Sequence, residues 1–225
     1  TPAWPSAFMA VLETYLGKYP ESFEIDGKTY TPVSFAESAG FDPDDYIEIT
    51  SYSHHPWFEK ICLEVPDNWS GDYYYNLPMD EMMEVINNAL ENGYSVAWDG
   101  DVSEGTFSHR NMLAILPEKD WESKSEQERE QTFKVPEKEK EVSQEMRQQS
   151  FDNYTTTDDH LMHLTGIEVD QDGKRYYMTK NSWGPDGNDL KGFLRMSEAY
   201  VRLKTIAIMV HRDALPEGLA EKMGL

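Results

Sequence analysis

Apolar residues recur at helical spacing near the start of the chain. Over residues 6–17 they fall on one face, which predicts a helix. Residues 31–40 predict a second, shorter helix. Between these stretches, Asp26-Gly27 suits a tight turn, so "FEIDGKTY" predicts a small hairpin. The first 45 residues are therefore expected to hold local structure with short connections.

The clearest helical pattern lies in "NLPMDEMMEVINNALENG", residues 76–93. Asp80 is a candidate N-cap and Gly93 a candidate end, because these residue types are favoured at those positions. One face of this predicted helix carries Met83, Ile86, Asn87 and Leu90. This face is expected to pack on a sheet.

Strand-like runs follow this helical pattern along the chain. "YSVAWDGDVS" predicts a buried strand that leaves into an acidic loop, and "NMLAIL" predicts another short strand. Four further runs cover residues 160–170, 175–183, 192–197 and 204–210. Their connections are too short for parallel crossovers, which favours an antiparallel sheet curled into a barrel or half-barrel. The predicted fold class is α+β, with helices packed around a barrel-like antiparallel sheet.

Two segments lack a sustained period. Residues 41–78 are rich in aromatic residues, Pro and Asp, which predicts an ordered loop with short strands. Residues 118–149 are highly charged, which indicates exposed helices split at Pro136 or a partly mobile excursion with a solvated face. We therefore interpret residues 1–225 as one portion of a domain, with helical and loop excursions at 1–45 and 118–150.

Composition restricts the partners. The formal net charge of the 225-residue chain is -22, which disfavours nucleic acid and anionic membrane surfaces as partners. No run approaches the roughly 18 apolar residues of a membrane span. The single cysteine, Cys62, excludes an intrachain disulfide. The sequence itself does not fix the compartment, and a start at "TPAWPSAF" without Met indicates that the natural N-terminus lies upstream.

Candidate chemistry is concentrated in one predicted hairpin. His160 opens its first strand and Asn181 follows its second, so antiparallel pairing brings both to one edge of the sheet. An amide oxygen there can accept from an imidazole N–H and fix the ring, which leaves the other ring nitrogen for a proton from a nucleophile. Asn rather than Asp in this role fits a thiol nucleophile. The indole of Trp183 is placed to shield the contact from water.

The runs "DDHLMHLTGI", "YYMTKNSWG" and "KGFLRMS" resemble the C-terminal half of papain-like cysteine peptidases, specifically the aminopeptidase C and bleomycin hydrolase family. The resemblance extends upstream through "YYNLPMDEMMEVINNALENGYSVAWDGDVS" and "HHPWFEKICLEV", and it covers roughly residues 45 to 215. It implies the right-hand half of a papain-like fold.

By this resemblance, His160 is the general base and ion-pair partner, Asn181 orients it, and Trp183 covers their contact. The implied activity is a cysteine-type aminopeptidase that cleaves near substrate N-termini through a thiolate and an acyl-enzyme. The resemblance implies no cofactor and no metal. The implied partners are peptide substrates, the N-terminal half of the same protein and further copies in a homo-oligomer, and the implied compartment is the cytoplasm.

Two features depart from the family pattern. The segment that carries the family's catalytic Cys and oxyanion-hole Gln has no match here. Cys62 lacks the neighbours of that nucleophile and is interpreted as a buried packing residue. The chain therefore resembles half of an enzyme, which predicts that it is inactive alone. The family's C-terminal arm is also shortened, since "ALPEGLAEKMGL" ends soon after the last strand.

Other residues compete for chemical roles. His163 is offset by three from His160, which places the two on opposite strand faces, and it is expected to pack or hydrogen-bond in the sheet. His54 and His55 are adjacent, so they should diverge and form no metal site. Asp99 and Asp101 either line the cleft or form a turn.

Two alternative functions stay open at this stage. One is a noncatalytic relative that binds peptides or acts as a scaffold. The other is a metal-dependent hydrolase that uses His160 with His54 or His55.

Overall fold

The computed structural model describes residues 2–225, and the chain divides into two compact units, Thr1–Asp44 and Asp45–Leu225. The boundary falls at the end of the predicted excursion over residues 1–45. Each unit is described by itself. No described helix is long and apolar enough to cross a bilayer.

The first unit contains α1 (Trp4–Leu16), the hairpin of β1 (Phe23–Ile25) and β2 (Lys28–Tyr30), and α2 (Pro32–Ser38). The predicted helices and hairpin are thus confirmed. Asp26 and Gly27 both have positive φ, which is the backbone of a type I′ turn. The rings of the hairpin and α2 pack together, whereas α1 buries none of its residues. The apolar face of α1 is therefore left open within this unit.

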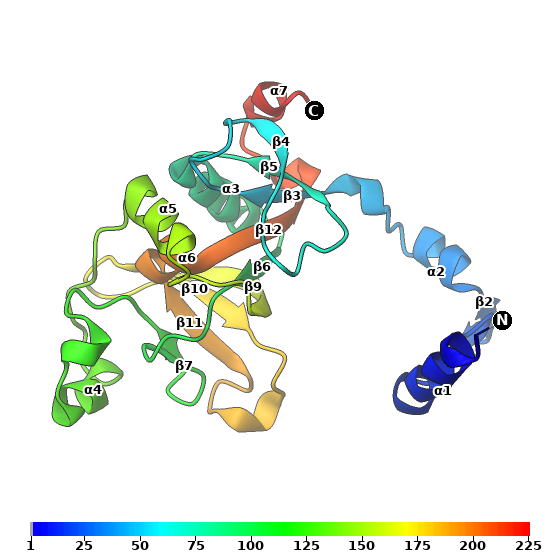
Figure 1. Ribbon diagram of the computed structural model, residues 1–225, viewed down its shortest axis with the longest axis horizontal. Coiled ribbons are helices and arrows are strands. Elements are labelled where there is room, and N and C mark those ends of the chain that lie inside the picture. The colour runs from blue at the N-terminus through cyan, green and yellow to red at the C-terminus, as the bar shows by residue number, and fades with distance from the viewer. Residues whose placement is uncertain (1) are drawn as a thin grey trace. The chain divides into compact units, whose positions relative to one another are not determined.

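The second unit is built on one ten-stranded sheet (Figure 1). Its strands are β3 (Tyr46–Thr50), β4 (Glu59–Cys62), β5 (Tyr73–Asn76), β6 (Val96–Gly100), β7 (Phe107–Ser108), β8 (Leu113–Ala114), β9 (His160–Val169), β10 (Arg175–Lys180), β11 (Phe193–Ser197) and β12 (Thr205–His211). The spatial order is β4-β5-β3-β12-β6-β9-β10-β11-β8-β7. The α+β class is confirmed, and β9, β10 and β11 form the expected antiparallel series.

Two details of the sheet differ from the expectation. The pairs β3–β5 and β8–β11 are parallel. The segments between the paired strands are long enough to bring the second strand back in the same direction as the first. The last strand, β12, pairs with β3 and β6 rather than with β11. The ladder has β4 and β7 as its ends, so among the described residues the strand pairing does not close a barrel.

Helix α3 (Met79–Glu91) packs its apolar face into the main core, whose members include Met83, Ile86 and Trp98. The predicted cap is wrong: Pro78 occupies the N-cap position and Asp80 lies in the first turn. Because Pro78 has no capping side chain, Oε1 of Gln144 accepts from the Met79 N–H instead, at 2.7 Å. A distant residue therefore replaces a local cap.

The remaining helices are α4 (Glu126–Thr132), α5 (Gln144–Asp152), α6 (Glu198–Lys204) and α7 (Leu219–Met223), with 3-10 turns at Pro43–Asp45, Trp121–Ser123, Pro185–Gly187 and Arg212–Ala214. The sequence reading missed α6, whose seven residues are too short for a clear period. Helices α4 and α5 lie on either side of Pro136, as predicted.

The prediction of a solvated face for this charged segment is wrong for α5. Arg147 is only 1% exposed and lies over the ring of Tyr52. Its guanidinium donates to the carbonyls of Ser51, Arg202 and Leu203. A charged side chain is thus buried because it joins α5 to the end of α6, which lies beside it in Figure 1.

Candidate active site

The contact between His160 and Asn181 arises from the pairing of β9 and β10. His160 is the first residue of β9, and Asn181 directly follows the last residue of β10, Lys180. Nε2 of His160 lies 3.0 Å from Oδ1 of Asn181. Asn181 is 2% exposed and His160 is half-buried. The predicted meeting of imidazole and carboxamide is therefore confirmed.

The orientation of the amide decides which ring nitrogen carries a proton. Oδ1 of Asn181 also accepts from the Ser182 main-chain N–H at 2.7 Å, so the oxygen must face this N–H. Nε2 of His160 is then the donor to Oδ1. Among the described residues, Nδ1 of His160 has no hydrogen-bond partner. The neutral ring thus presents a lone pair at Nδ1.

Trp183 lies against this pair. Its ring centroid is 5.2 Å from that of His160, with the planes tilted by 45°. The indole is itself 54% exposed, so it covers one side of the imidazole while its own outer side faces solvent. Trp183 therefore gives partial shielding.

His109 is a site residue that the sequence reading missed. Its ring packs edge-on against Trp183, with centroids 5.1 Å apart, and the residue is 9% exposed. Its Nδ1 is buried without a hydrogen-bond partner. Burial, together with the charges of Lys180 and His160, lowers the pKa of His109 below its usual range. A neutral imidazole at His109 therefore packs against the indole of Trp183. No sequence motif around residue 109 indicates this packing.

A cleft of 960 Å³ borders the His160–Asn181 pair. It runs over the exposed face of the sheet and past the start of β9. Its lining includes both His160 and the exposed His163. The expectation that His163 packs within the sheet is wrong, and the two histidines border one cleft because the cleft extends over a strand face and beyond the strand end.

Carboxylates form much of the cleft wall. They are Glu48, Asp67, Asp99, Asp158 and Asp159. Burial, and then the nearby Asp158, raises the pKa of Asp99 to about 8. Burial also raises the pKa of Asp158. Since two close carboxylates resist joint ionisation, this pair retains a proton near neutral pH.

The two roles considered for Asp99 and Asp101 divide between them. Asp99 lines the cleft, whereas Asp101 is 1% exposed and forms a turn by accepting from the N–H and hydroxyl of Ser103. Asp99 lies within β6 and points to the open face of the sheet, whereas Asp101 lies beyond the end of the strand, where alternation no longer applies and the chain turns into the interior.

The two adjacent histidines do not diverge as expected. The rings of His54 and His55 are 4.3 Å apart, and both contact Glu64, so the three could hold a metal ion. However, the side-chain oxygen of Gln148 accepts from the Ser53 N–H, which fixes the orientation of the amide. The amide nitrogen of Gln148 therefore donates to Nδ1 of His54. His54 therefore presents an N–H at Nε2, where a metal would need a lone pair.

His160 is not part of that cluster among the described residues. It is engaged with Asn181 instead. Within residues 2–225, the one group of candidate ligands does not include His160, which the metal-dependent hydrolase alternative requires.

Cys62 is not the buried packing residue that was expected. It is exposed at the end of β4, because alternation turns Ile61 inward and Cys62 outward. Nδ2 of Asn68 lies 3.6 Å from its sulfur. Cys62 does not line the cleft that borders His160.

Comparison with known proteins places this geometry in context. The model of the Peptidase C1-like family matches residues 16–224. Aminopeptidase C of Lactobacillus helveticus is 24% identical over 204 residues, which cover 88% of this chain and 42% of that protein. Aminopeptidase C of Streptococcus thermophilus is 26% identical over 195 residues, covering 84% and 40%.

The fold has a counterpart among solved structures. PepW from Lactobacillus rhamnosis HN001 superimposes with a TM-score of 0.69 at 20% identity, over 97% of this chain and 49% of that one. The chain thus spans less than half the length of these relatives. Since the family model covers nearly all of its residues, the chain belongs to the Peptidase C1-like family.

Proposed function

We propose that this chain supplies the base of a cysteine-type aminopeptidase, with His160 as general base and Asn181 as the residue that orients it. The observation that carries the proposal is the 3.0 Å contact between Nε2 of His160 and Oδ1 of Asn181 at the border of a large cleft. Because Asn181 engages Nε2, Nδ1 of His160 stays available to take a proton, as activation of a thiol requires.

In this mechanism Nδ1 of His160 takes the proton of a cysteine thiol, and the imidazolium and thiolate form an ion pair. The thiolate attacks the substrate carbonyl carbon, the C–N bond breaks, and the imidazolium gives its proton to the departing amine. Water then loses a proton to the imidazole as its oxygen attacks the thioester carbon. The C–S bond breaks, and the imidazolium returns its proton to the departing thiolate, which releases the acid and restores the thiol. Asn181 holds the ring throughout, and Trp183 limits water on one side.

The nucleophile comes from another part of the protein in this proposal. Cys62 is exposed and outside the cleft, so it is not in place to react with His160. The sheet face that lines the cleft exposes Leu161 and Met209, at 67% and 40%, which suits a surface that another protein segment covers. We assign that segment to the N-terminal half of the same protein, and we expect the complete protein to form homo-oligomers that act on peptides.

The test compares His160→Ala with His163→Ala in the full-length protein. His163 is a matched control, because it is on the same strand and borders the same cleft. His160→Ala should lower kcat/KM for aminoacyl substrates by about a thousandfold or more, and Asn181→Ala by a smaller factor of about 10 to 100. His163→Ala should change it by less than about threefold.

Unchanged thiol-dependent turnover in His160→Ala would contradict the assignment. The present chain alone should show no thiol-dependent aminopeptidase activity. Inhibitor-sensitive turnover by the isolated chain would instead place the nucleophile within these 225 residues.

A further inference from the structure

The segment that leads into His160 has no regular structure. Helix α5 ends at Asp152 and β9 begins at His160, so residues 153–159 must be held by other parts of the molecule. Since β9 starts with His160, this segment determines where the chain enters the strand. The question is which contacts fix it.

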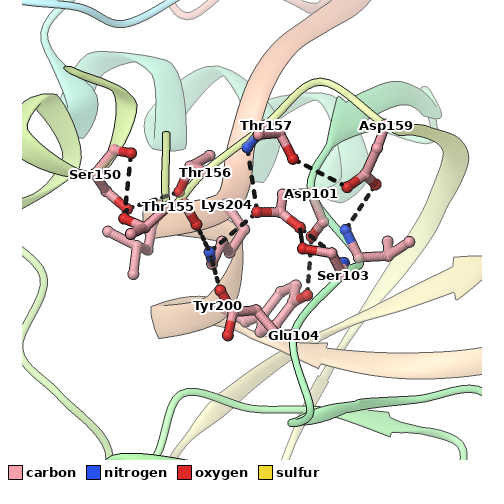
Figure 2. A network of polar contacts seen from close by, with 12 residues as sticks. Asp101, Ser103, Glu104, Ser150, Thr155, Thr156, Thr157, Asp159, Tyr200 and Lys204 are labelled. Carbon is pink, nitrogen blue, oxygen red and sulfur yellow. Dashed lines mark hydrogen bonds and ion pairs between the residues drawn. The ribbon is translucent and has the colours of Figure 1, made fainter. Parts of the chain in front are cut away.

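A buried ion pair supplies two of them, beside those that Ser150 makes (Figure 2). Lys204 and Asp101 are 2% and 1% exposed, and Nζ of Lys204 lies 3.1 Å from Oδ2 of Asp101. Lys204 also donates to the carbonyl of Thr155 at 2.5 Å, and the same Asp101 oxygen accepts from the Thr157 N–H at 3.2 Å. Each member of the pair thus holds one main-chain group of the segment.

A second set of contacts ties the same segment to the residues after β6. Asp159 accepts from the Val102 N–H at 3.0 Å and from the hydroxyl of Thr157. The Asp101 N–H donates to the carbonyl of Lys204 at 3.0 Å. The side-chain pair is therefore reinforced by main-chain bonds.

Gly100 permits this close junction. It is the residue of β6 that lies opposite His160 in the sheet. A Cβ at Gly100 would fall 2.3 Å from the carbonyl oxygen of Lys204, so no other residue fits without a shift of the backbone. The ion pair and the start of β9 thus meet at one tightly packed point.

We infer that Asp101 and Lys204 are positioning residues for the imidazole of His160. They fix the chain just before His160, at Thr155 and Thr157, so that the ring reaches Asn181 in the required orientation. This inference rests on the proposed function, because His160 is the general base only under that proposal. The position of the His160 ring can nevertheless be measured without any peptidase activity.

The pair is suited to a positioning role because its polar atoms are satisfied. Asp101 accepts from Ser103 and Thr157 as well as from Lys204, and Lys204 also contacts Glu104. A buried ion pair is tolerated when further hydrogen bonds complete it, and loss of one partner leaves a costly unpaired charge. The arrangement therefore favours one geometry over nearby alternatives.

The test uses Lys204→Met in the present chain with ¹⁵N-labelled histidine. In the unmodified chain, the neutral ring of His160 should be protonated at Nε2, and the Thr157 amide should be protected from hydrogen exchange. In Lys204→Met, exchange at Thr157 should become about tenfold faster or more, and the preference for the Nε2 proton should fall. Asn181→Ala sets the reference for complete loss of that preference.

Lys222→Met is the matched control, because Lys222 also pairs with a carboxylate, that of Glu81, but at an exposed position. It should leave both readouts unchanged. A folded Lys204→Met chain with the same Thr157 exchange and the same His160 tautomer would overturn the inference.

A second measurement applies if Lys204→Met does not fold. Hydrogen exchange of the unmodified chain should show the Thr157 and Val102 amides protected, although Thr157 is an exposed residue. Exchange of the Thr157 amide at the rate of an unstructured peptide would overturn the inference by itself. Neither result depends on whether the complete protein is a peptidase.

Discussion

The cleft that borders His160 and the buried network of Asp101 and Lys204 differ in how many of their buried polar atoms have hydrogen-bond partners. On the cleft side, Asn181 and His109 each keep a buried nitrogen without a partner, and the pKa of Asp99 is raised to about 8. In the network, Asp101 and Lys204 have several partners each. The buried polar atoms of the Asp101–Lys204 network are therefore paired within this chain, whereas some of those at the cleft are not.

The largest expected effect lies outside both regions, at the buried Arg147, whose Nη2 also lacks a partner. Arg147→Ala should lower the free energy of unfolding by about 3 kcal/mol or more, because it removes a fully buried side chain and takes a charged donor from the carbonyls of Ser51 and Arg202. Urea unfolding measures the change. The exposed Arg212 is the control, and Arg212→Ala should cost less than about 0.5 kcal/mol. Equal effects would show that the burial of Arg147 does not stabilise the fold.

On the cleft side, substitution should stabilise. The folded state holds a proton on Asp99 up to about pH 8, whereas the unfolded carboxyl releases it near its ordinary pKa of 3.8. The folded state therefore binds more protons between these values, and stability falls as pH rises through that window. Asp99→Asn should raise the free energy of unfolding at pH 8 by roughly 1–2 kcal/mol.

The comparison at pH 4 supplies an internal control, since Asp99→Asn should have little effect there. Glu221→Gln, at an exposed position, should give no pH-dependent gain. A loss of stability at pH 8 in Asp99→Asn would contradict the raised pKa.

His109 should produce a smaller effect of opposite direction in pH. Because burial lowers the pKa of His109, the unfolded state takes up a proton first as pH falls below the ordinary value of 6.5, and stability is lost on acidification. His109→Phe keeps a ring against Trp183 and removes this titration. The stability difference between pH 7.5 and pH 5.5 should therefore be smaller in His109→Phe than in the unmodified chain, as thermal unfolding at the two pH values would show.

The smallest effect concerns Cys62. Its exposed sulfur should react with a thiol reagent in the folded chain at a rate close to that of the unfolded chain. Cys62→Ser should change stability by less than about 0.5 kcal/mol. Slow modification that requires unfolding would restore the buried position originally expected for this residue.

Local sequence patterns were sufficient for several elements and for the contact between His160 and Asn181. The Asp26-Gly27 turn, the apolar face of residues 79–91 and the hairpin that joins His160 to Asn181 all depend on neighbours in sequence or on the next strand. Such features follow from periodicity and turn chemistry.

Contacts between distant segments were not predictable in the same way. Gln144 caps α3 across 65 residues, Arg147 joins segments 55 and 96 residues away, and His109 packs on Trp183 without any motif. Each depends on tertiary packing that overrides local propensity. The exposure of Cys62 depends on strand register, which a short run of residues does not fix.

The most direct test of the central claim is a structure of the full-length protein with a thiol-directed peptide inhibitor bound. Since Nε2 of His160 is engaged by Asn181, the reactive sulfur should lie within roughly 4 Å of Nδ1 of His160, with the inhibitor in the cleft. A modified sulfur far from His160, or one nearer to Nε2 with the Asn181 contact broken, would contradict the account.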